Sequence, residues 1–391
     1  MRRITHGEMM EERPLIFRAV NAPLIASVVL LTVYGSVVVS SAVSSMSSGP
    51  SMLKRHLFGI GLGLVFMAVA WAFDYRKLEG WAGPLMALSA LLIVSPRILG
   101  FLKVSKAISG SYSWLSIGKV RLFQPSEPAK LVVIVVLAAV IARYGGKIER
   151  PADVARICGF AAVPFVLILT QPDLGTGFVF IAIAVGMMLI GGLQPKWFLV
   201  LALAGVLLVG GLFAAESIAF RVTGDHNKVI PKHQMDRLTV FFDPSADSAN
   251  AGFHVQQSKI AIGSGELSGK GLRAGTQGNL YFLPERHTDF IFSVLGEELG
   301  FVGAIVLLGL YLALLVTAMS ISASSRDLFG ALIVAGVCTM WLFQILENIG
   351  MTIGVVPVTG IPLPFMSYGA SFMVTNMTAI GMLLSVWTRR Y

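Results

Sequence analysis

The stretch FHVQQSKIAIGSGELSGKGLRAGTQGNLYFLPERHTDFIFSVLGEELG, residues Phe253–Gly300, is the one long polar segment in an otherwise apolar chain. It is rich in glycine, and near its end it carries the ionisable residues Glu285, Arg286, His287 and Asp289. An apolar run follows at once. Ionisable groups are costly to desolvate, so a cluster of them beside an apolar run marks a functional site. We therefore predict that this stretch holds the chemistry of the protein.

The composition is that of an integral membrane protein. Hydrophobic residues make up 55% of the 391 residues and charged residues only 13%, whereas a soluble chain is about a quarter charged. The net charge of +9 would suit nucleic acid, but the basic residues flank apolar runs as topology signals do, so we predict no nucleic-acid partner. The two cysteines, Cys158 and Cys338, lie in or beside apolar runs, so we expect buried thiols rather than a disulfide or a metal site.

Ten apolar runs approach the roughly 20 residues that a spanning helix needs. The first is too long for a signal-peptide core of about 7–15 residues. The fifth is short and must extend into polar neighbours, tilt or break, while the eighth is long and can begin as a non-spanning segment. The runs lie at about Ala19–Val43, Leu57–Phe73, Trp81–Leu102, Pro128–Tyr144, Ile157–Thr170, Gly175–Leu193, Trp197–Phe213, Phe290–Met319, Leu328–Gly350 and Ser371–Trp387.

This pattern predicts an all-α polytopic membrane protein, a single domain over residues 1–391 with a bundle of about ten transmembrane helices. A long loop, about residues 214–289, separates the seventh helix from the eighth. Basic residues in the short loops favour a cytoplasmic N-terminus by about two to one. We therefore predict that both termini are cytoplasmic and that the long loop is extracytoplasmic.

Charges inside the predicted spans should face a cavity or a partner. Glu127 and Lys130 stand three residues apart, hence on one helix face, and Ser126 is placed to cap that helix. Asp173 lies in a Pro- and Gly-broken segment, where it can cap the next helix, pair with Lys130 or contact substrate. A structural ion pair and direct substrate contact both remain open for these residues.

Three further polar features lie near the same ends of the predicted helices. Glu297 and Glu298 are adjacent, so we expect one to face a polar cavity and the other the loop. Gln344, Glu347 and Asn348 form a polar group near the end of the ninth run. The segment Val356–Ala370 contains three prolines, so it cannot form a regular helix, and we predict that it lines the site as a re-entrant wall.

Six motifs, in this order along the chain, resemble those of the SEDS family (shape, elongation, division and sporulation). They are FQPSEPAKL (Phe123–Leu131), QPDLGTG (Gln171–Gly177), QSKIAIGSG (Gln257–Gly265), GKGLRAGTQ (Gly269–Gln277), FLPERHTDFIFSVLGEELG (Phe282–Gly300) and PVTGIPLPFMSYGAS (Pro357–Ser371). Within the family, the GTQ of Gly275–Gln277 and the QSKIAIGSG run resemble the elongation branch, RodA, more than the division branch, FtsW. Pro128 and Ala370 depart from the family pattern without touching an ionisable group.

The resemblance implies a peptidoglycan glycosyltransferase in the bacterial cytoplasmic (inner) membrane. Such enzymes polymerise lipid II into β-1,4-linked glycan strands on the outer face, for cell elongation and cell shape, together with a class B penicillin-binding protein. The acceptor GlcNAc 4-hydroxyl attacks MurNAc C1, and polyprenyl pyrophosphate leaves. A base must take the hydroxyl proton. Asp289, between loop and apolar run, is the first candidate and matches the family's essential acid; Glu285 is the second, and a helix cap is the structural alternative for Asp289.

The pyrophosphate requires cations and backbone donors. Lys270 and Arg273, among glycines, are predicted to supply both, and His287 is predicted to be a hydrogen-bonding neighbour of the site. Further candidates for the cation are Lys259, Arg286 and Lys130. No dedicated metal cage is visible, so a divalent cation (Mg²⁺ or Mn²⁺) would come bound to the pyrophosphate. A lipid II flippase or other transporter is the main alternative, since broken helices and buried charges also suit transport. A non-catalytic scaffold would leave the acid–base cluster unexplained.

Overall fold

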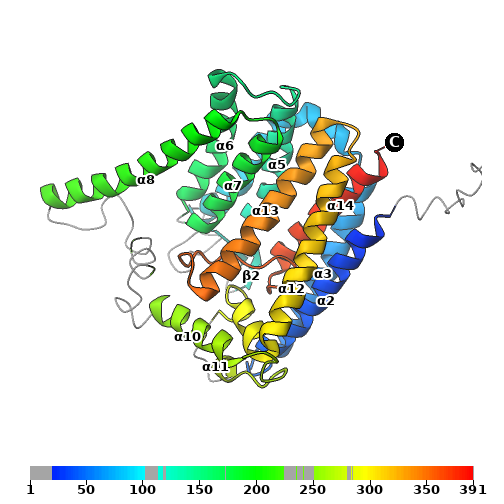
Figure 1. Ribbon diagram of the computed structural model, residues 1–391, viewed down its shortest axis with the longest axis vertical. Coiled ribbons are helices and arrows are strands. Elements are labelled where there is room, and N and C mark those ends of the chain that lie inside the picture. The colour runs from blue at the N-terminus through cyan, green and yellow to red at the C-terminus, as the bar shows by residue number, and fades with distance from the viewer. Residues whose placement is uncertain are drawn as a thin grey trace, which may run out of the picture.

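The computed structural model describes residues 20–101, 113–117, 120–171, 173–223, 235, 241, 251–279, 283 and 285–390. These residues form a bundle of antiparallel helices (Figure 1). The helices are α2 (Ala22–Ala42), α3 (Gly49–Ala72), the 3₁₀ helix η1 (Tyr75–Trp81), α4 (Ala82–Phe101), α5 (Ser126–Ala142), α6 (Pro151–Leu169), α7 (Leu174–Ile190), α8 (Pro195–Thr223), α10 (Ala251–Ser264), α11 (Thr276–Asn279), α12 (Ile291–Ala323), α13 (Leu328–Ile353) and α14 (Ala370–Thr388).

Each of the ten predicted runs lies in a helix of the described chain, so the predicted membrane bundle is confirmed. Among the described helices, eight are long and apolar enough to cross a membrane. The other two runs form α5 and α7, which have 17 residues each and pack inside the bundle. The sequence did not predict the short antiparallel hairpin of β1 (Leu115–Ile117) and β2 (Val120–Phe123), which leads into α5.

The two runs of unusual length behave differently. The short fifth run extends into polar neighbours, as one of the predicted options required, because α6 already begins at Pro151 and includes Asp153 and Arg156. The long eighth run is broken. Gly300 has φ +63 and ψ −162, so residues 291–299 form a short helix before the spanning part of α12.

The break at Gly300 frees backbone groups that would otherwise bond within the helix. The loop formed by residues 265–271 satisfies them. Two loop N–H groups donate to the carbonyls before the break, and two loop carbonyls accept from the N–H groups after it: Lys270 N to Glu297 O (3.0 Å), Gly271 N to Glu298 O (2.9 Å), Phe301 N to Glu266 O (2.9 Å) and Val302 N to Leu267 O (3.1 Å).

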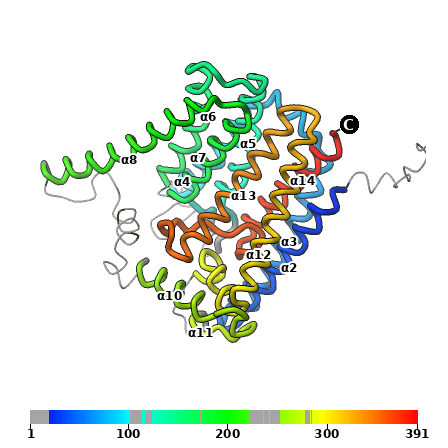
Figure 2. Tube along the Cα trace, viewed as in Figure 1, coloured from blue at the N-terminus to red at the C-terminus, as the bar shows by residue number. Residues whose placement is uncertain are grey.

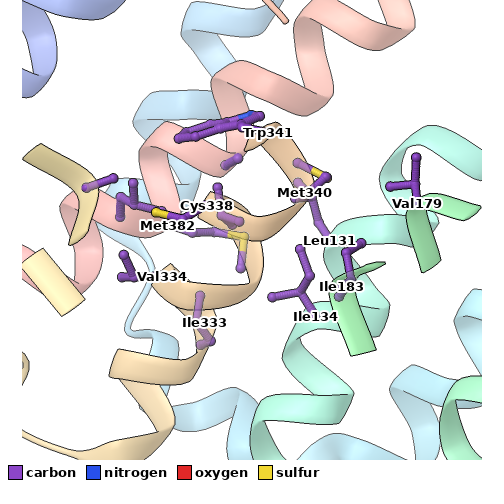
Figure 3. Packing of buried hydrophobic residues seen from close by; sticks show 14 of the residues in the cluster. Leu131, Ile134, Val179, Ile183, Ile333, Val334, Cys338, Met340, Trp341 and Met382 are labelled. Carbon is purple, nitrogen blue, oxygen red and sulfur yellow. The ribbon is translucent and has the colours of Figure 1, made fainter. Parts of the chain in front are cut away.

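Helix α13 forms the centre of the core and packs against α5, α7, α12 and α14. Figure 3 shows Cys338 and Trp341 of α13 among apolar side chains of the neighbouring helices. The buried Trp341 Nε1 donates to Asn376 Oδ1 of α14 at 2.7 Å. Cys338 is buried as predicted, whereas Cys158 is only half-buried; both thiols are free.

Two helices at the edges of the bundle contrast with each other. On α3, Gly59 and Gly63 allow close packing, since a Cβ added there would lie 2.8 Å from Ala370 Cα and 2.9 Å from Met377 Cγ of α14. Helix α8 instead extends away from the bundle (Figure 2). Most of its apolar side chains are exposed, for example Val206 at 69%, as expected of a helix surrounded by lipid.

Candidate functional site

The segment between α13 and α14, residues 354–369, has no regular structure and folds back into the bundle. Gly354 ends α13 in the left-handed conformation at φ +75. Leu363, Phe365 and Met366 beyond it are completely buried, and Tyr311 of α12 donates its hydroxyl to Pro364 O at 2.6 Å. The segment is therefore the buried irregular wall that its prolines predicted. It lies at the end of the bundle that carries α10 and α11, opposite the C-terminus (Figure 1).

This wall closes a small polar cavity of about 60 Å³. Three chain regions contribute: the start of α5, the start of α7 and the wall itself. The cavity is large enough for water but not for a sugar ring. Its lining residues are Gln124, Glu127, Lys130, Asp173, Thr176, Val179, Gly360, Ile361 and Pro362. The structure thus brings together the three charged residues that the sequence placed near the ends of two helices, Glu127 and Lys130 on α5 and Asp173 before α7.

Glu127 and Lys130 form a buried ion pair on α5. The Lys130 Nζ lies 2.8 Å from Glu127 Oε2, and the two side chains are only 2% and 4% exposed. The ammonium also stands 5.7 Å from the centre of the Phe372 ring, a cation–π distance. The predicted cap at Ser126 is wrong, because the helix begins at Ser126 itself and its Oγ has no hydrogen-bond partner among the described residues.

Asp173 caps α7 rather than bonding to Lys130. Its carboxylate accepts from the Thr176 N–H at 3.0 Å and from the Thr176 hydroxyl at 2.9 Å. The capping alternative is therefore confirmed, and the ion pair of Lys130 is with Glu127 instead. Asp173 still faces the same cavity, so its negative charge adds to the field around Lys130.

Asp289 lies in the turn of residues 285–290 that precedes α12. The N-cap position of α12 is Phe290, and this helix has no side-chain cap hydrogen bond among the described residues. Asp289 therefore does not serve as the N-cap of α12, which was the structural alternative to its role as a base. The carboxylate instead faces the wall: a Cβ placed on Gly360 would lie 3.1 Å from Asp289 Oδ2. Gly360 also lines the cavity, so it neighbours both the Asp289 carboxylate and the space that holds the charged cluster.

Gly360 is a site residue that the sequence analysis did not single out. We expect Gly360→Ala to lower glycan polymerisation by about 10²-fold, the effect of a misplacement of about 1 Å at a reacting group. The residue has φ +76, which strains alanine, and the new methyl group would crowd the Asp289 carboxylate. Gly354→Ala is the matched control, because Gly354 has φ +75 but its Cβ would meet the flexible end of Lys259 and, at an ordinary contact distance of 3.4 Å, Val255 Cγ1. Equal loss of activity in both variants would assign the effect to backbone strain.

The other ionisable residues of the turn lie around Asp289 in different environments. Glu285 is exposed, and its carboxylate accepts from the Thr288 hydroxyl at 3.2 Å. Arg286 is only 1% exposed and donates from Nη2 to Ser45 Oγ at 2.6 Å. Burial and the charge of Arg286 lower the pKa of His287 despite the opposing effect of Glu285, which favours the neutral imidazole. Arg286 thus ties the turn to the loop after α2.

Lys270 and Arg273 lie in the loop that docks on the break in α12. The Lys270 ammonium pairs with Glu297 at 2.7 Å, and the N–H of Arg273 donates to Ser41 Oγ at 2.9 Å. The backbone N–H groups of Lys270 and Gly271, which the sequence analysis offered to a pyrophosphate, already donate to α12. The glycines serve this docking: a Cβ on Gly269 would lie 2.2 Å from Glu298 O.

Glu297 and Glu298 differ in direction, as adjacent helical residues must, but neither lines the cavity. The Glu297 carboxylate accepts from the Thr276 N–H at 2.7 Å and the Gln277 N–H at 3.1 Å, and so holds the start of α11. Glu298 accepts from the Ser41 hydroxyl of α2 at 2.8 Å. The expectation that one of them faces the cavity is not supported, since both fasten the loop to the bundle.

The described residues offer no ready-made cage for a metal ion. Among them, no group of three His, Cys, Asp or Glu side chains is arranged to hold one. The cavity has two carboxylates, but Glu127 is paired with an ammonium group and Asp173 is occupied as a cap. These side chains do not fit a resident divalent cation.

Comparison with known proteins agrees with this arrangement. The model of the family described as "Cell cycle protein" (FtsW/RodA/SpoVE) matches residues 21–391. The peptidoglycan glycosyltransferase MrdB of Escherichia coli K12 is 38% identical over 92% of this chain and 91% of its own length. The peptidoglycan glycosyltransferase RodA of Treponema pallidum is 33% identical over 86% and 90%.

Among solved structures, a chain of a peptidoglycan synthase complex that coordinates polymerization and crosslinking superposes with a TM-score of 0.73. It shares 30% sequence identity, and the match covers 96% of this chain and 97% of that chain. The motifs, the bundle and these similarities agree. This chain therefore belongs to the FtsW/RodA/SpoVE family, the SEDS family, with the RodA-like features that its motifs indicated.

Proposed function

We propose that this peptidoglycan glycosyltransferase polymerises lipid II into β-1,4-linked glycan strands during cell elongation, with Asp289 as the general base. One observation carries the assignment of the base. The Asp289 carboxylate faces Gly360, at the wall of the cavity that holds Glu127, Lys130 and Asp173, and it stands at the entrance to a membrane helix without capping it. The relatives named as peptidoglycan glycosyltransferases support the reaction class.

In this reaction Asp289 takes the proton from the acceptor GlcNAc 4-hydroxyl as its oxygen attacks MurNAc C1. The bond from C1 to the pyrophosphate oxygen breaks, and polyprenyl pyrophosphate leaves with the electron pair. Direct displacement inverts the configuration at C1, which converts the α-linked donor into a β-linked product. Among the residues that line the cavity, Lys130 carries the positive charge, and its ammonium would counter the developing negative charge.

The position of the charges supports catalysis over transport. A transporter concentrates its substrate-binding groups near the bilayer midplane. Here Glu127 lies in the first turn of α5, Asp173 caps α7 and Asp289 precedes α12. All three stand at the starts of their helices, at the end of the bundle where the loop of residues 265–279 docks. A flippase or transporter is thus the weaker explanation.

The partner is proposed to be a class B penicillin-binding protein, which would cross-link the strands. The similar chain in a complex for polymerization and crosslinking supports this. The test uses the purified chain, labelled lipid II and a gel that resolves glycan length, with and without the cognate penicillin-binding protein. We expect glycan strands, with a higher yield in the presence of the partner. Movement of lipid II across vesicles without any polymer would instead favour the transporter.

Any divalent cation is proposed to enter with the substrate, held by the pyrophosphate oxygens. The ion would neutralise charge on the leaving group. The same polymerisation assay, run without Mg²⁺ and Mn²⁺ and with added chelator, tests whether the reaction uses a divalent cation.

We propose that both termini are cytoplasmic and that the loop predicted over about residues 214–289 lies outside the cytoplasmic membrane, as the basic residues favour. The predicted start of this loop is wrong, because residues 214–223 belong to α8. Ser268→Cys, at an exposed loop position, should react with a membrane-impermeant maleimide in intact cells. Ser324→Cys, exposed between α12 and α13, should react only after the membrane is opened. The reverse labelling pattern would invert the orientation.

A further inference from the structure

The turn that carries Asp289 is held by three hydrogen bonds to three consecutive carbonyl groups. His287 O accepts from the Tyr368 N–H at 2.9 Å. Thr288 O accepts from the Ser367 hydroxyl at 2.7 Å. Asp289 O accepts from the Asn348 Nδ2 at 2.8 Å. All three donors come from the end of α13 or from the irregular wall, so this region fixes the orientation of each peptide unit that leads to the carboxylate.

Asn348 connects the turn to the polar cavity. Its side chain is completely buried, and the same Nδ2 also donates to Ile361 O at 2.8 Å. Ile361 lines the cavity with Glu127 and Lys130. The Asn348 Oδ1 has no hydrogen-bond partner within the described part of the chain. The polar contribution of this side chain therefore consists of two donated bonds, one to each side of the site.

Ser367 makes the corresponding link from the wall. It is completely buried, and its Oγ accepts from the Leu363 N–H at 2.8 Å while it donates to Thr288 O. The hydroxyl thus joins the tight turn of the wall to the residue before Asp289. A buried carbonyl that loses such a donor is left unsatisfied or shifts toward another partner.

We propose that Asn348 and Ser367 are positioning residues that hold the Asp289 carboxylate against Gly360 and the cavity. This rests on the proposed role of Asp289 as the base. The turn has internal bonds, from the Thr288 and Phe290 N–H groups to Glu285 O at 3.2 Å each, and the donors from α13 and the wall add the bonds that hold it against the cavity. Neither residue touches the reacting atoms; each acts through the backbone of residues 287–289.

The first test measures kcat and KM for lipid II in Ser367→Ala and Asn348→Leu. We expect kcat to fall by about 10–10²-fold, because small displacements of a catalytic group have effects of this order, with KM changed by less than about twofold, since substrate binding is not the interaction removed. Ser385→Ala and Asn376→Leu are matched controls. Ser385 is buried and donates to Phe73 O at 2.6 Å near the C-terminal end of α14. Asn376 is buried and makes two bonds, as Asn348 does: its Nδ2 donates to Phe372 O at 2.9 Å, and its Oδ1 accepts from Trp341 Nε1 at 2.7 Å.

The controls should lose thermal stability as much as the test variants do while retaining kcat. Loss of kcat in proportion to thermal stability, in test and control variants alike, would overturn the proposal. If Asn348→Leu does not fold, the comparison of Ser367→Ala with Ser385→Ala decides alone.

The second test is a double-mutant cycle with Asp289→Asn, measured as residual polymerisation in long incubations. If Ser367 acts through the Asp289 carboxylate, Ser367→Ala should lower the rate little further in the Asp289→Asn protein. An equal fold-loss in both backgrounds would overturn the positioning role. If Asp289→Asn polymerises normally, the proposed base is wrong and the positioning role fails with it. If Asp289→Asn is inactive while Ser367→Ala and Asn348→Leu keep the wild-type kcat, only the positioning role fails.

Discussion

Asp289→Asn is expected to yield a folded, membrane-inserted protein that polymerises lipid II about 10²–10⁴-fold more slowly than the wild type, the usual contribution of a positioned acid or base. Asparagine keeps the size of the side chain and the backbone carbonyl that accepts from Asn348. It cannot accept a proton from the acceptor hydroxyl. The measurement is the rate of glycan formation from labelled lipid II by the purified variant.

A matched control is Asp327→Asn at the far end of the bundle. Asp327 caps α13 by accepting from the Gly330 N–H at 2.6 Å, and asparagine is an equally good cap, so activity should survive. Near-normal polymerisation by a well-expressed Asp289→Asn protein would contradict the assignment. Glu285 would then become the first candidate, and Glu285→Gln should show the loss instead.

Lys130→Met is expected to destabilise the protein by about 3–5 kcal/mol, the usual effect of leaving one member of a buried ion pair without its partner. The Glu127 carboxylate would remain in a site where it is almost fully buried. The double variant Glu127→Gln with Lys130→Met should regain most of this stability, because no uncompensated charge remains. Thermal unfolding of the purified proteins in detergent gives the comparison.

The same pair of variants separates the structural role of the ion pair from a role in the reaction. If Lys130 also stabilises charge on the leaving group, the double variant should be stable and yet polymerise poorly. Full recovery of both stability and activity would leave the pair with a structural role alone. A single variant that is as stable as the double variant would contradict the buried pair itself.

The sequence predicted the membrane bundle well, because apolar runs of helical length have few alternatives in a membrane. It also predicted the irregular wall, since the prolines of residues 357–364 exclude a helix. The proximity of Glu127, Lys130 and Asp173 followed from the cost of burying charges singly. These predictions depend on local composition and on energies that hold in any membrane fold.

The sequence was less informative about which polar group faces which partner. The glycine-rich stretch around Lys270 resembled an anion-binding loop, yet its N–H groups are bonded to the break in α12. Asp173 could pair or cap, and only the fold shows that it caps. Asn348 was visible as a polar residue in an apolar run, but its two acceptors lie 59 and 13 residues away in the chain. Hydrogen bonds between residues this far apart in the chain cannot be predicted from the spacing of residues in the sequence.

The interrupted start of α12 also bears on how relatives of this protein can be recombined. Residues 291–299 are bonded to the loop at one end, through Glu297 and Glu298, and precede Gly300. The combination of φ +63 and ψ −162 at Gly300 strains any other residue. The loop and this short helix thus form one structural unit that should be exchanged as a whole, with the chimeric junction placed after Gly300. A chimera that exchanges the loop but joins the chains at the start of α12 would mix the donors and acceptors of all four backbone bonds between the loop and α12 from two parents, whereas a junction after Gly300 splits two of these four, those at Phe301 and Val302.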